Sequence, residues 1–346
     1  MENNRIMTFQ ELLEYRSRKQ NDEILKGKVT ADLFGEKLIF YNNNTKLLEA
    51  DLDVSTINIK PNLSETEETV LLNAIDRTGS RTPYRCEFYP SASSQNSTNF
   101  SKYGVKYANI DQNFADNPNF STFRDWFNGL LNNRIIVPDT CILQNHYLSK
   151  VLLPRIQDTL KIRIPRTVIL ELESKGNLEP KNKPVIFSTF NEIRKLQLQY
   201  HAQNFPDPIR GEFQANFSKI IGAGGGDRFI RLEIWDYLKL FSGGMRSLNT
   251  DEEMILLTKD MMMASAASAE GLDTFYLCPA QPKKSYKLTN LNQLVTELAI
   301  GFSKIRIEGL FKEYDVCCEG IWSGKDIMDW GLDRLRICSS TPGEPR

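Results

Sequence analysis

Short hydrophobic segments separated by turn residues mark the first part of the chain. Between residues 28 and 60 these segments are KVTADLF, KLIFY, KLLEADL and TINIK. Gly35 and a run of asparagines at 42–44 fall between some of them. Strand-forming segments broken by Gly and Asn predict a small antiparallel meander.

Helical patterns flank this meander on both sides. At 8–26, Thr8 and Glu11 have the spacing of a capping box, and apolar residues follow on one face. At 65–75 a second helix is expected, with Ser64 as its cap. Together these elements predict an N-terminal α+β domain.

After residue 120 the pattern changes to strands that alternate with helices. A short helix is expected at 121–132, and it leads into the first strand. The expected strands are IIV, KIRIP, MILLT and DTFYL, at 135–137, 161–165, 254–258 and 273–277. The expected helices lie at 141–160, from near Pro165, and at 188–203, 227–241 and 261–270. This alternation predicts a parallel sheet with right-handed crossovers.

The length of 346 residues suits two domains with additions. Residues 91–120 are rich in Ser, Asn, Gln and Asp, which predicts a polar linker at the end of an N-terminal domain, 1–120. An α/β domain is expected at 121–284 and a C-terminal extension at 285–346. The extension is expected to begin with a helix, NLNQLVTELAIGF, that covers the α/β sheet, and to continue as a small strand–turn–helix unit.

Composition excludes several classes of function. The net charge is −1, so a nucleic-acid site must be a local patch rather than a global positive field. The six cysteines form no CxxC pair and only two histidines are present, so neither a structural zinc site nor a disulfide framework is expected. The sequence has no apolar signal core or membrane-spanning run, which predicts a cytoplasmic protein.

A carboxylate follows the first predicted strand of the α/β domain, at Asp139. Ligands of open α/β sheets bind beyond the carboxyl ends of the strands, which makes Asp139 a candidate for chemistry. Because Asp is also a common helix cap, an equally plain interpretation is that Asp139 only caps the next helix.

Three other acidic residues occupy comparable places in the alternation: Glu171, Asp227 and Asp260. Carboxylates that converge in one crevice repel one another and raise each other's pKa, unless a cation compensates. Hard oxygen ligands select Mg²⁺ or Mn²⁺. The arrangement predicts a metal site suited to phosphodiester hydrolysis.

Four segments in this order, VPDTCIL, IPRTVILELESK, GGDRFIRL and ILLTKDMMMASAASAEGL, resemble the signature segments of PIN-domain nucleases. The resemblance covers about residues 132–280 and is most specific in the last segment. It implies a three-layer α/β/α fold with a parallel central sheet. It also implies an endoribonuclease with an acidic quartet of Asp139, Glu171, Asp227 and Asp260, in which Thr258 supports the last position.

Alternatives stay open for individual acids. Glu173 competes with Glu171, although only Glu171 matches the Glu-Leu of the family and lies beside an apolar face. Asp227 and Asp260 are also candidates for simple helix caps. The chain as a whole has two alternative functions, a non-catalytic PIN-like scaffold that binds RNA or protein and a structure-specific DNA nuclease.

Single-stranded RNA is the expected partner, and a polyanion requires cations around the acidic site. The candidate substrate-binding residues flank the four acids: Thr140, Arg166, Lys175, Arg228, Thr258 and Lys259. A protein partner for residues 1–120 and a homo-oligomer stay open, and no membrane partner is expected.

Overall fold

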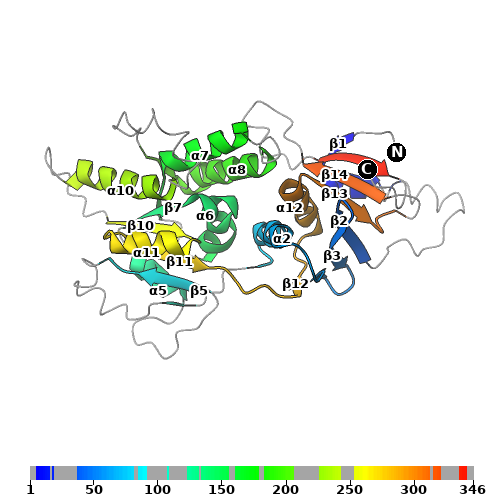
Figure 1. Cartoon of the computed structure of the whole chain (residues 1–346), viewed down its shortest axis with the longest axis horizontal. Helices are drawn as coiled ribbons and strands as arrows, with labels where there is room; N and C mark the ends of the chain where they lie inside the picture. The colour runs from blue at the N-terminus through cyan, green and yellow to red at the C-terminus, as the bar shows by residue number, and fades with distance from the viewer. Residues whose placement is uncertain are drawn as a thin grey trace, which may run out of the picture. The chain divides into compact units, whose positions relative to one another are not determined.

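Two units make up the chain, and each is built around its own sheet (Figure 1). Unit 1 contains residues 1–81, 181–188 and 282–346, and unit 2 contains residues 82–180 and 189–281. The computed structural model describes residues 5–15, 18, 37–81, 85–91, 107–108, 123–131, 134–155, 160–178, 183–205, 226–242, 253–311, 315–320 and 335–340. The fold is mixed α/β, as the alternation in the sequence predicts.

Unit 1 holds an eight-stranded sheet in the order β1-β15-β14-β13-β2-β3-β4-β12, antiparallel at every pairing. Its strands are β1 (Arg5–Met7), β2 (Lys37–Asn42), β3 (Thr45–Asp51), β4 (Thr56–Ile59), β12 (Ser285–Lys287), β13 (Lys304–Glu308), β14 (Asp315–Gly320) and β15 (Leu335–Ser340). The predicted meander is confirmed by β2, β3 and β4, whereas its first segment, KVTADLF, lies outside the described residues.

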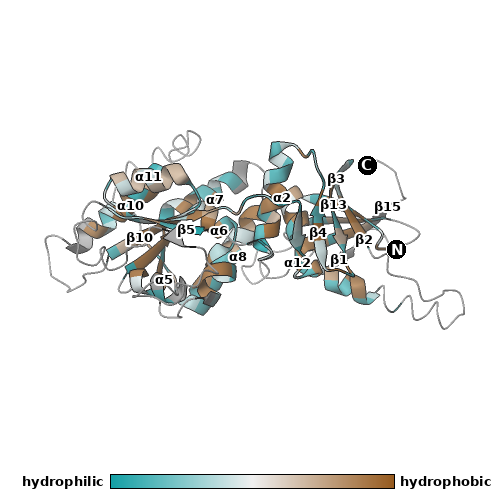
Figure 2. Cartoon of the chain, turned by 90° about the horizontal axis from the view of Figure 1, so that it is seen from below, coloured by the Kyte–Doolittle hydropathy of each residue, from teal (hydrophilic) through white to brown (hydrophobic). Residues whose placement is uncertain are grey.

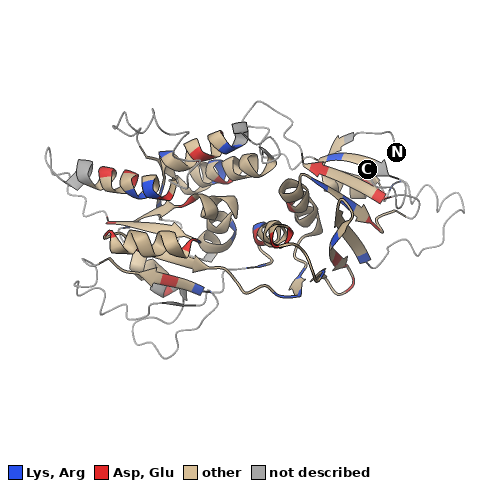
Figure 3. Cartoon of the chain, in the orientation of Figure 1, with Lys and Arg blue, Asp and Glu red and all other residues tan. Residues whose placement is uncertain are grey.

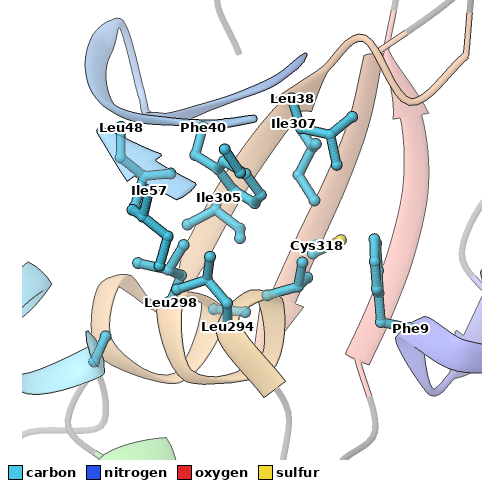
Figure 4. Close-up of a cluster of buried hydrophobic side chains, with 14 of the residues drawn as sticks. Phe9, Leu38, Phe40, Leu48, Ile57, Leu294, Leu298, Ile305, Ile307 and Cys318 are labelled. Carbon is cyan, nitrogen blue, oxygen red and sulfur yellow. The ribbon is translucent and has the colours of Figure 1, made fainter. Parts of the chain in front are cut away.

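Helices α2 (Glu65–Arg77) and α12 (Leu291–Phe302) pack together, and α12 also packs on β13 and β14. Ser64 caps α2 through the predicted capping box with Glu67, and Thr8 and Glu11 form the other predicted box. Leu294 and Leu298 of α12 face Phe40 and Ile305 of the strands (Figure 4). In Figure 2, α2 carries both hydrophobic and hydrophilic residues, as expected of a helix that covers a core on one side.

The strands of residues 285–346 complete the N-terminal sheet, which corrects the prediction of a separate extension. Arg306, Ile307 and Glu308 of β13 pair with β2, and β15 pairs with β1. The helix predicted to cover the α/β sheet covers this antiparallel sheet instead. The sequence pattern missed this because pairing between strands more than 260 residues apart leaves no local signal. The predicted turn–helix after β14 lies outside the described residues.

Unit 2 holds a seven-stranded sheet in the order β6-β5-β11-β10-β7-β8-β9. Its strands are β5 (Arg85–Tyr89), β6 (Tyr107–Ala108), β7 (Arg134–Pro138), β8 (Lys161–Ile164), β9 (Gln203–Asn204), β10 (Glu253–Thr258) and β11 (Asp273–Cys278). The five from β7 to β11 are parallel, as predicted. β5 runs antiparallel to β11, so the boundary between units lies near residue 82 and not near 120.

The helices of unit 2 largely follow the predicted pattern. They are α5 (Phe123–Leu131), α6 (Thr140–Gln144), α7 (Arg166–Leu178), most of α8 (Lys183–Tyr200), α10 (Gly226–Ser242) and α11 (Met261–Ala269). The single helix expected at 141–160 is broken: α6 ends before His146, whose φ is +54°, and a π-helical turn follows at Leu148–Leu152. No helix among the described residues is both long and apolar enough to cross a membrane.

The strand order places a topological switch point between β7 and β10. From β7 the chain proceeds on one side to β8 and β9, and it later returns to β10 and β11 on the other side (Figure 1). In open α/β sheets this is where the crevice for a ligand forms, because the connections leave the two strands in opposite directions. The carboxyl ends of β7 and β10 therefore define the place to look for a site.

Candidate active site

Asp139 follows β7 directly at the switch point and is 4 % exposed. Its backbone N–H donates to the carbonyl of Leu257 in β10, at 2.9 Å, which fixes the two strand ends together. Its carboxylate accepts from the Thr140 N–H at 2.6 Å, the Thr258 hydroxyl at 2.7 Å and the Cys141 thiol at 3.1 Å. Asp139 thus caps α6 and also faces β10, so the two interpretations of this residue are compatible.

Thr258 ends β10 with a fully buried side chain. Its hydroxyl donates to Asp139 and accepts from the backbone N–H of Asp260, at 3.0 Å. The Asp260 carboxylate caps α11 by accepting from the N–H groups of Met262 and Met263, at 2.7 and 3.0 Å. The Asp260 side chain is exposed. One hydroxyl therefore joins the acids that follow the two central strands.

Glu171 reaches the same place from α7. The Thr140 hydroxyl donates to its Oε2 at 2.7 Å, and the Lys175 ammonium donates to its Oε1 at 2.5 Å. The competing acid, Glu173, is exposed, whereas the Glu171 side chain is 15 % exposed. The geometry therefore selects Glu171 over Glu173 as the acid that faces Asp139.

Asp227 lies in the first turn of α10, directly after Gly226. A Cβ added to Gly226 would lie 3.5 Å from Oε2 of Glu171, so the start of α10 packs against that carboxylate. The pKa of Asp227 is raised to about 6, first by burial and then by the negative charges of Asp139, Asp260 and Glu171, while Arg231 lowers it. The three other predicted acids thus all raise the pKa of Asp227.

The surroundings of Asp139 limit this repulsion. Burial raises the pKa of Asp139, and the nearby charge of Glu171 raises it too, whereas hydrogen bonds from Cys141, Thr258 and Thr140 lower it. Three donors thus favour a buried carboxylate in its charged form.

The donor set fits a hard divalent cation in its chemistry, since it consists of carboxylate oxygens with excess negative charge. Among the described residues, however, no three His, Cys, Asp or Glu side chains are gathered closely enough to enclose an ion. Mg²⁺ is usually held by only one or two carboxylates and keeps several waters. Pairs of these acids therefore suit Mg²⁺ or Mn²⁺, and an all-protein cage of the kind that holds Ca²⁺ is not formed by the described side chains.

The predicted substrate-binding residues divide into two groups. Thr140 and Thr258 donate to the carboxylates and so orient the acids themselves. The cations surround the site in different ways: Lys175 pairs with Glu171, the Lys259 ammonium lies 5.2 Å from the centre of the Tyr147 ring, and Arg228 is exposed. For Arg166, the backbone N–H donates to Glu233 at 2.7 Å.

Sequence reasoning missed Glu233, which joins the helices that carry Glu171 and Asp227. From α10, its carboxylate accepts from the N–H groups of Arg166 and Thr167 and from the Thr167 hydroxyl, at 2.7, 3.0 and 2.8 Å. Glu233 therefore caps the start of α7. A sequence signal existed, because Glu233 shares the helical spacing of the buried Ile230, Ile234 and Tyr237.

Cys141 was not singled out from the sequence, yet it contacts the residues that follow both central strands of the site. Its sulfur donates to Asp139 and accepts from the Lys259 N–H at 3.2 Å. Burial, followed by the charge of Asp139, raises the pKa of this thiol well above its usual value, so the thiol is protonated and serves as a donor. Its place two residues after Asp139 was the only signal available.

No protein-family model and no curated protein matches the chain. One solved structure with some similarity is a domain of a functionally unknown protein from Methanocaldococcus jannaschii. The two share 21 % identity with a TM-score of 0.32, over 43 % of this chain and 94 % of that chain. Because that protein's function is itself unknown, the functional argument rests on the site.

Proposed function

We propose that the chain is a metal-dependent endoribonuclease with a PIN-like α/β/α domain in unit 2. One observation carries the proposal: a continuous series of contacts links four acids from four separate segments. It runs from the Asp260 N–H through Thr258 to Asp139, then through Thr140 to Glu171, and ends at Gly226 beside Asp227. Helix capping alone explains Asp139 and Asp260 but gives no reason for Glu171 and Asp227 to lie beside them.

A bound Mg²⁺ or Mn²⁺ ion would polarise a phosphodiester and lower the pKa of water at this site. Asp139, Glu171, Asp227 and Asp260 would hold it. Thr258 and Thr140 fix the orientation of Asp139 and Glu171 through hydrogen bonds, which is how the partners of metal ligands keep them in place. Lys175 neutralises part of the charge on Glu171. Burial and the neighbouring acids raise the pKa of Asp227 to about 6, so its charged form gains from a compensating cation.

RNA is the proposed substrate because of the order of the four segments and their resemblance to PIN-domain nucleases. The acids lie beside cations that suit a phosphate backbone, namely Lys259 and the exposed Arg228. Arg228 and Asp260 are exposed and Lys259 is partly exposed, so a backbone could reach positive charge and an acid of the site together.

The test uses two acids that lie on the same helix. Glu171→Gln removes a charge from the series of contacts, whereas Glu173→Gln removes one from an exposed position two residues away. With labelled single-stranded RNA and Mn²⁺, we expect Glu171→Gln, Asp139→Asn and Asp260→Asn each to lose more than about 100-fold in cleavage rate, since even partners of metal ligands cost 10- to 100-fold. Glu173→Gln should cut like the parent.

Cleavage by Asp139→Asn at the parental rate, with its melting temperature unchanged, would show that the acids are not catalytic. A DNA oligonucleotide of the same sequence, assayed in parallel, separates a ribonuclease from a DNA nuclease.

A second function, a PIN-like binding scaffold without catalysis, is favoured by one observation. Protein donors already engage Asp139, Glu171 and Asp260, and no three-ligand metal set is formed among the described residues. A scaffold predicts RNA binding that is indifferent to divalent ions and no cleavage by any preparation.

A further inference from the structure

Four lysines gather where β12 pairs with β4, at one edge of the unit 1 sheet: Lys60, Lys283, Lys284 and Lys287. Ser285 lies opposite Asn58 and Lys287 opposite Thr56 in the antiparallel ladder. The Ile59 N–H donates to the carbonyl of Lys284, at 2.8 Å, so the pairing continues past the ladder. Lys60 comes directly after Ile59 and Lys283 directly before Lys284, the two residues joined by this hydrogen bond. Two segments more than 220 residues apart thus place four positive charges together, and the stretch around β12 is blue in Figure 3.

All four lysines are exposed. None of them has an acidic partner within 4.0 Å among the residues that the structure describes. The acids on the neighbouring strand β3 are already engaged, since Glu49 pairs with Lys37 and Lys46 at 3.2 Å and Asp51 lies 4.0 Å from Lys37. The edge therefore keeps a local positive charge within a chain whose net charge is −1.

The strand pleat directs Lys60 and Lys287 away from the core, and Lys284 lies just before the strand. Tyr286 points into the core of unit 1 and is 8 % exposed, so Ser285 and Lys287 point to the opposite face. Asn58 and Ser285, both exposed and directly paired, add neutral hydrogen-bond donors to that face. Lysines on an edge strand also prevent edge-to-edge pairing, but that role does not account for Lys60, which follows the inner strand β4.

We propose that this lysine edge, made of Lys60, Lys283, Lys284 and Lys287, binds the phosphate backbone of RNA. The choice of RNA as the polyanion rests on the proposed function. Lysines that contact phosphates release condensed counterions, so each contact to a single strand contributes about 0.7 to the slope of log affinity against log salt. A backbone contact of this kind carries no sequence information, so the edge would hold RNA of any sequence.

The experiment measures this salt slope on the full chain. Binding of a fluorescent single-stranded RNA is titrated from low to moderate salt in EDTA, which withholds divalent ions so that cleavage does not interfere. With all four lysines replaced by Gln, we expect the slope to fall by up to about 2.8, and affinity near 0.1 M salt to fall on the order of 100-fold. An unchanged melting temperature shows that the variant is folded.

A charge-matched pair of double variants supplies the control. Lys283→Gln with Lys284→Gln removes two unpaired lysines, whereas Lys37→Gln with Lys46→Gln removes two paired ones from the same sheet. The first pair should lower the slope by about 1.4, and the second pair should change it much less. Equal effects from the two pairs would mean that only total charge matters, and the lysine edge would then be no site.

Two further outcomes separate this inference from the proposed function. If RNA binds through the lysine edge but is never cleaved in Mn²⁺, the nuclease proposal is wrong and the RNA-binding role of the lysine edge stands. If the quadruple variant cleaves RNA normally and keeps the parental salt slope, the RNA-binding role of the lysine edge is wrong and the nuclease proposal stands. Binding to vesicles that contain phosphatidylserine, with no binding to RNA, would also overturn the assignment of RNA.

Discussion

The buried ion pairs of unit 1 and the acidic site of unit 2 differ in how their carboxylates are compensated. In unit 1, Glu297 accepts from the Arg77 guanidinium at 2.6 Å, and Asp76 from that of Arg81 at 2.5 Å. These side chains are at most 7 % exposed. Each negative charge thus has its own fixed cation, within helices α2 and α12 or just beyond them.

The acidic site of unit 2 has the opposite arrangement. The described donors to Asp139 are Thr140, Cys141 and Thr258, all of them neutral, and the carboxylate of Glu171 adds a repulsive charge. A buried ion pair is complete in the folded protein, whereas a group of acids with too few cations still favours an added positive charge. The comparison teaches that negative charge in excess of its partners, rather than burial, distinguishes a candidate site from a structural pair.

The largest expected effect tests the structural role of the pairs in unit 1. Arg77→Ala leaves Glu297 buried without a cation, so unfolding in urea should require about 3–5 kcal/mol less free energy. Replacing both partners, as Arg77→Met with Glu297→Leu, removes the isolated charge and should cost much less. If the double variant is as unstable as Arg77→Ala, the pair stabilises the fold by more than cancelling its two charges, and the comparison fails.

Glu233 sharpens the comparison, since it is a buried carboxylate of unit 2 with a structural role. Glu233→Ala leaves the Arg166 and Thr167 N–H groups without their acceptor, and we expect a loss of about 1–3 kcal/mol in the free energy of unfolding. Glu233→Gln keeps one acceptor oxygen and should lose less. Equal stability of the parent and the Ala variant would show that α7 does not need this cap.

Thr258 tests whether orientation of the acids matters. Thr258→Val keeps the buried shape and removes the hydroxyl between Asp139 and Asp260, so RNA cleavage should fall about 10- to 100-fold. Thr258→Ser retains the hydroxyl and should recover most of the rate. The measurement is a single-turnover rate in Mn²⁺, and a Val variant as fast as Ser would exclude an orienting role.

The smallest expected effect is stabilisation by metal. An ion that binds only the folded protein, present at ten times its Kd, stabilises it by about 1.4 kcal/mol. Thermal unfolding of the parent should therefore shift upward as Mn²⁺ is added, and that of Asp139→Asn should shift less. Arg77→Ala is far from these acids in sequence and belongs to unit 1, so it should retain the parental shift; loss of the shift there would break the distinction between the two regions.

Local patterns predicted most of unit 2 from the sequence. The strands at 135–137, 161–165, 254–258 and 273–277 are present with small changes at their ends, because buried parallel strands are continuous apolar runs. Two of the predicted acids, Asp139 and Asp260, follow such runs, and the Thr258 hydroxyl bonds to the carboxylate of the first and the N–H of the second. The sequence already favoured Glu171 over Glu173, and the structure adds the hydrogen bond from the Thr140 hydroxyl to Glu171.

The sequence failed where partners lie far apart along the chain. No local sequence pattern in β13 predicts that it pairs with β2, and none in β5 predicts that it pairs with β11. The lysine edge was missed for the same reason, since Lys60 and Lys283 are neighbours only through strand pairing. For Glu233 the sequence showed a helical spacing shared with buried residues, but it did not show that the carboxylate accepts from Arg166 and Thr167.

The pairing of β13 with β2 has a consequence for how the protein is made. Almost all of unit 2 lies between the N-terminal and C-terminal segments of unit 1, so the ribosome must release residues 304–308 before β2 can pair with β13. Domains usually fold in the order of synthesis. Here unit 2 can fold first, while one edge of β2 keeps unpaired N–H and C=O groups until β13 has been synthesised.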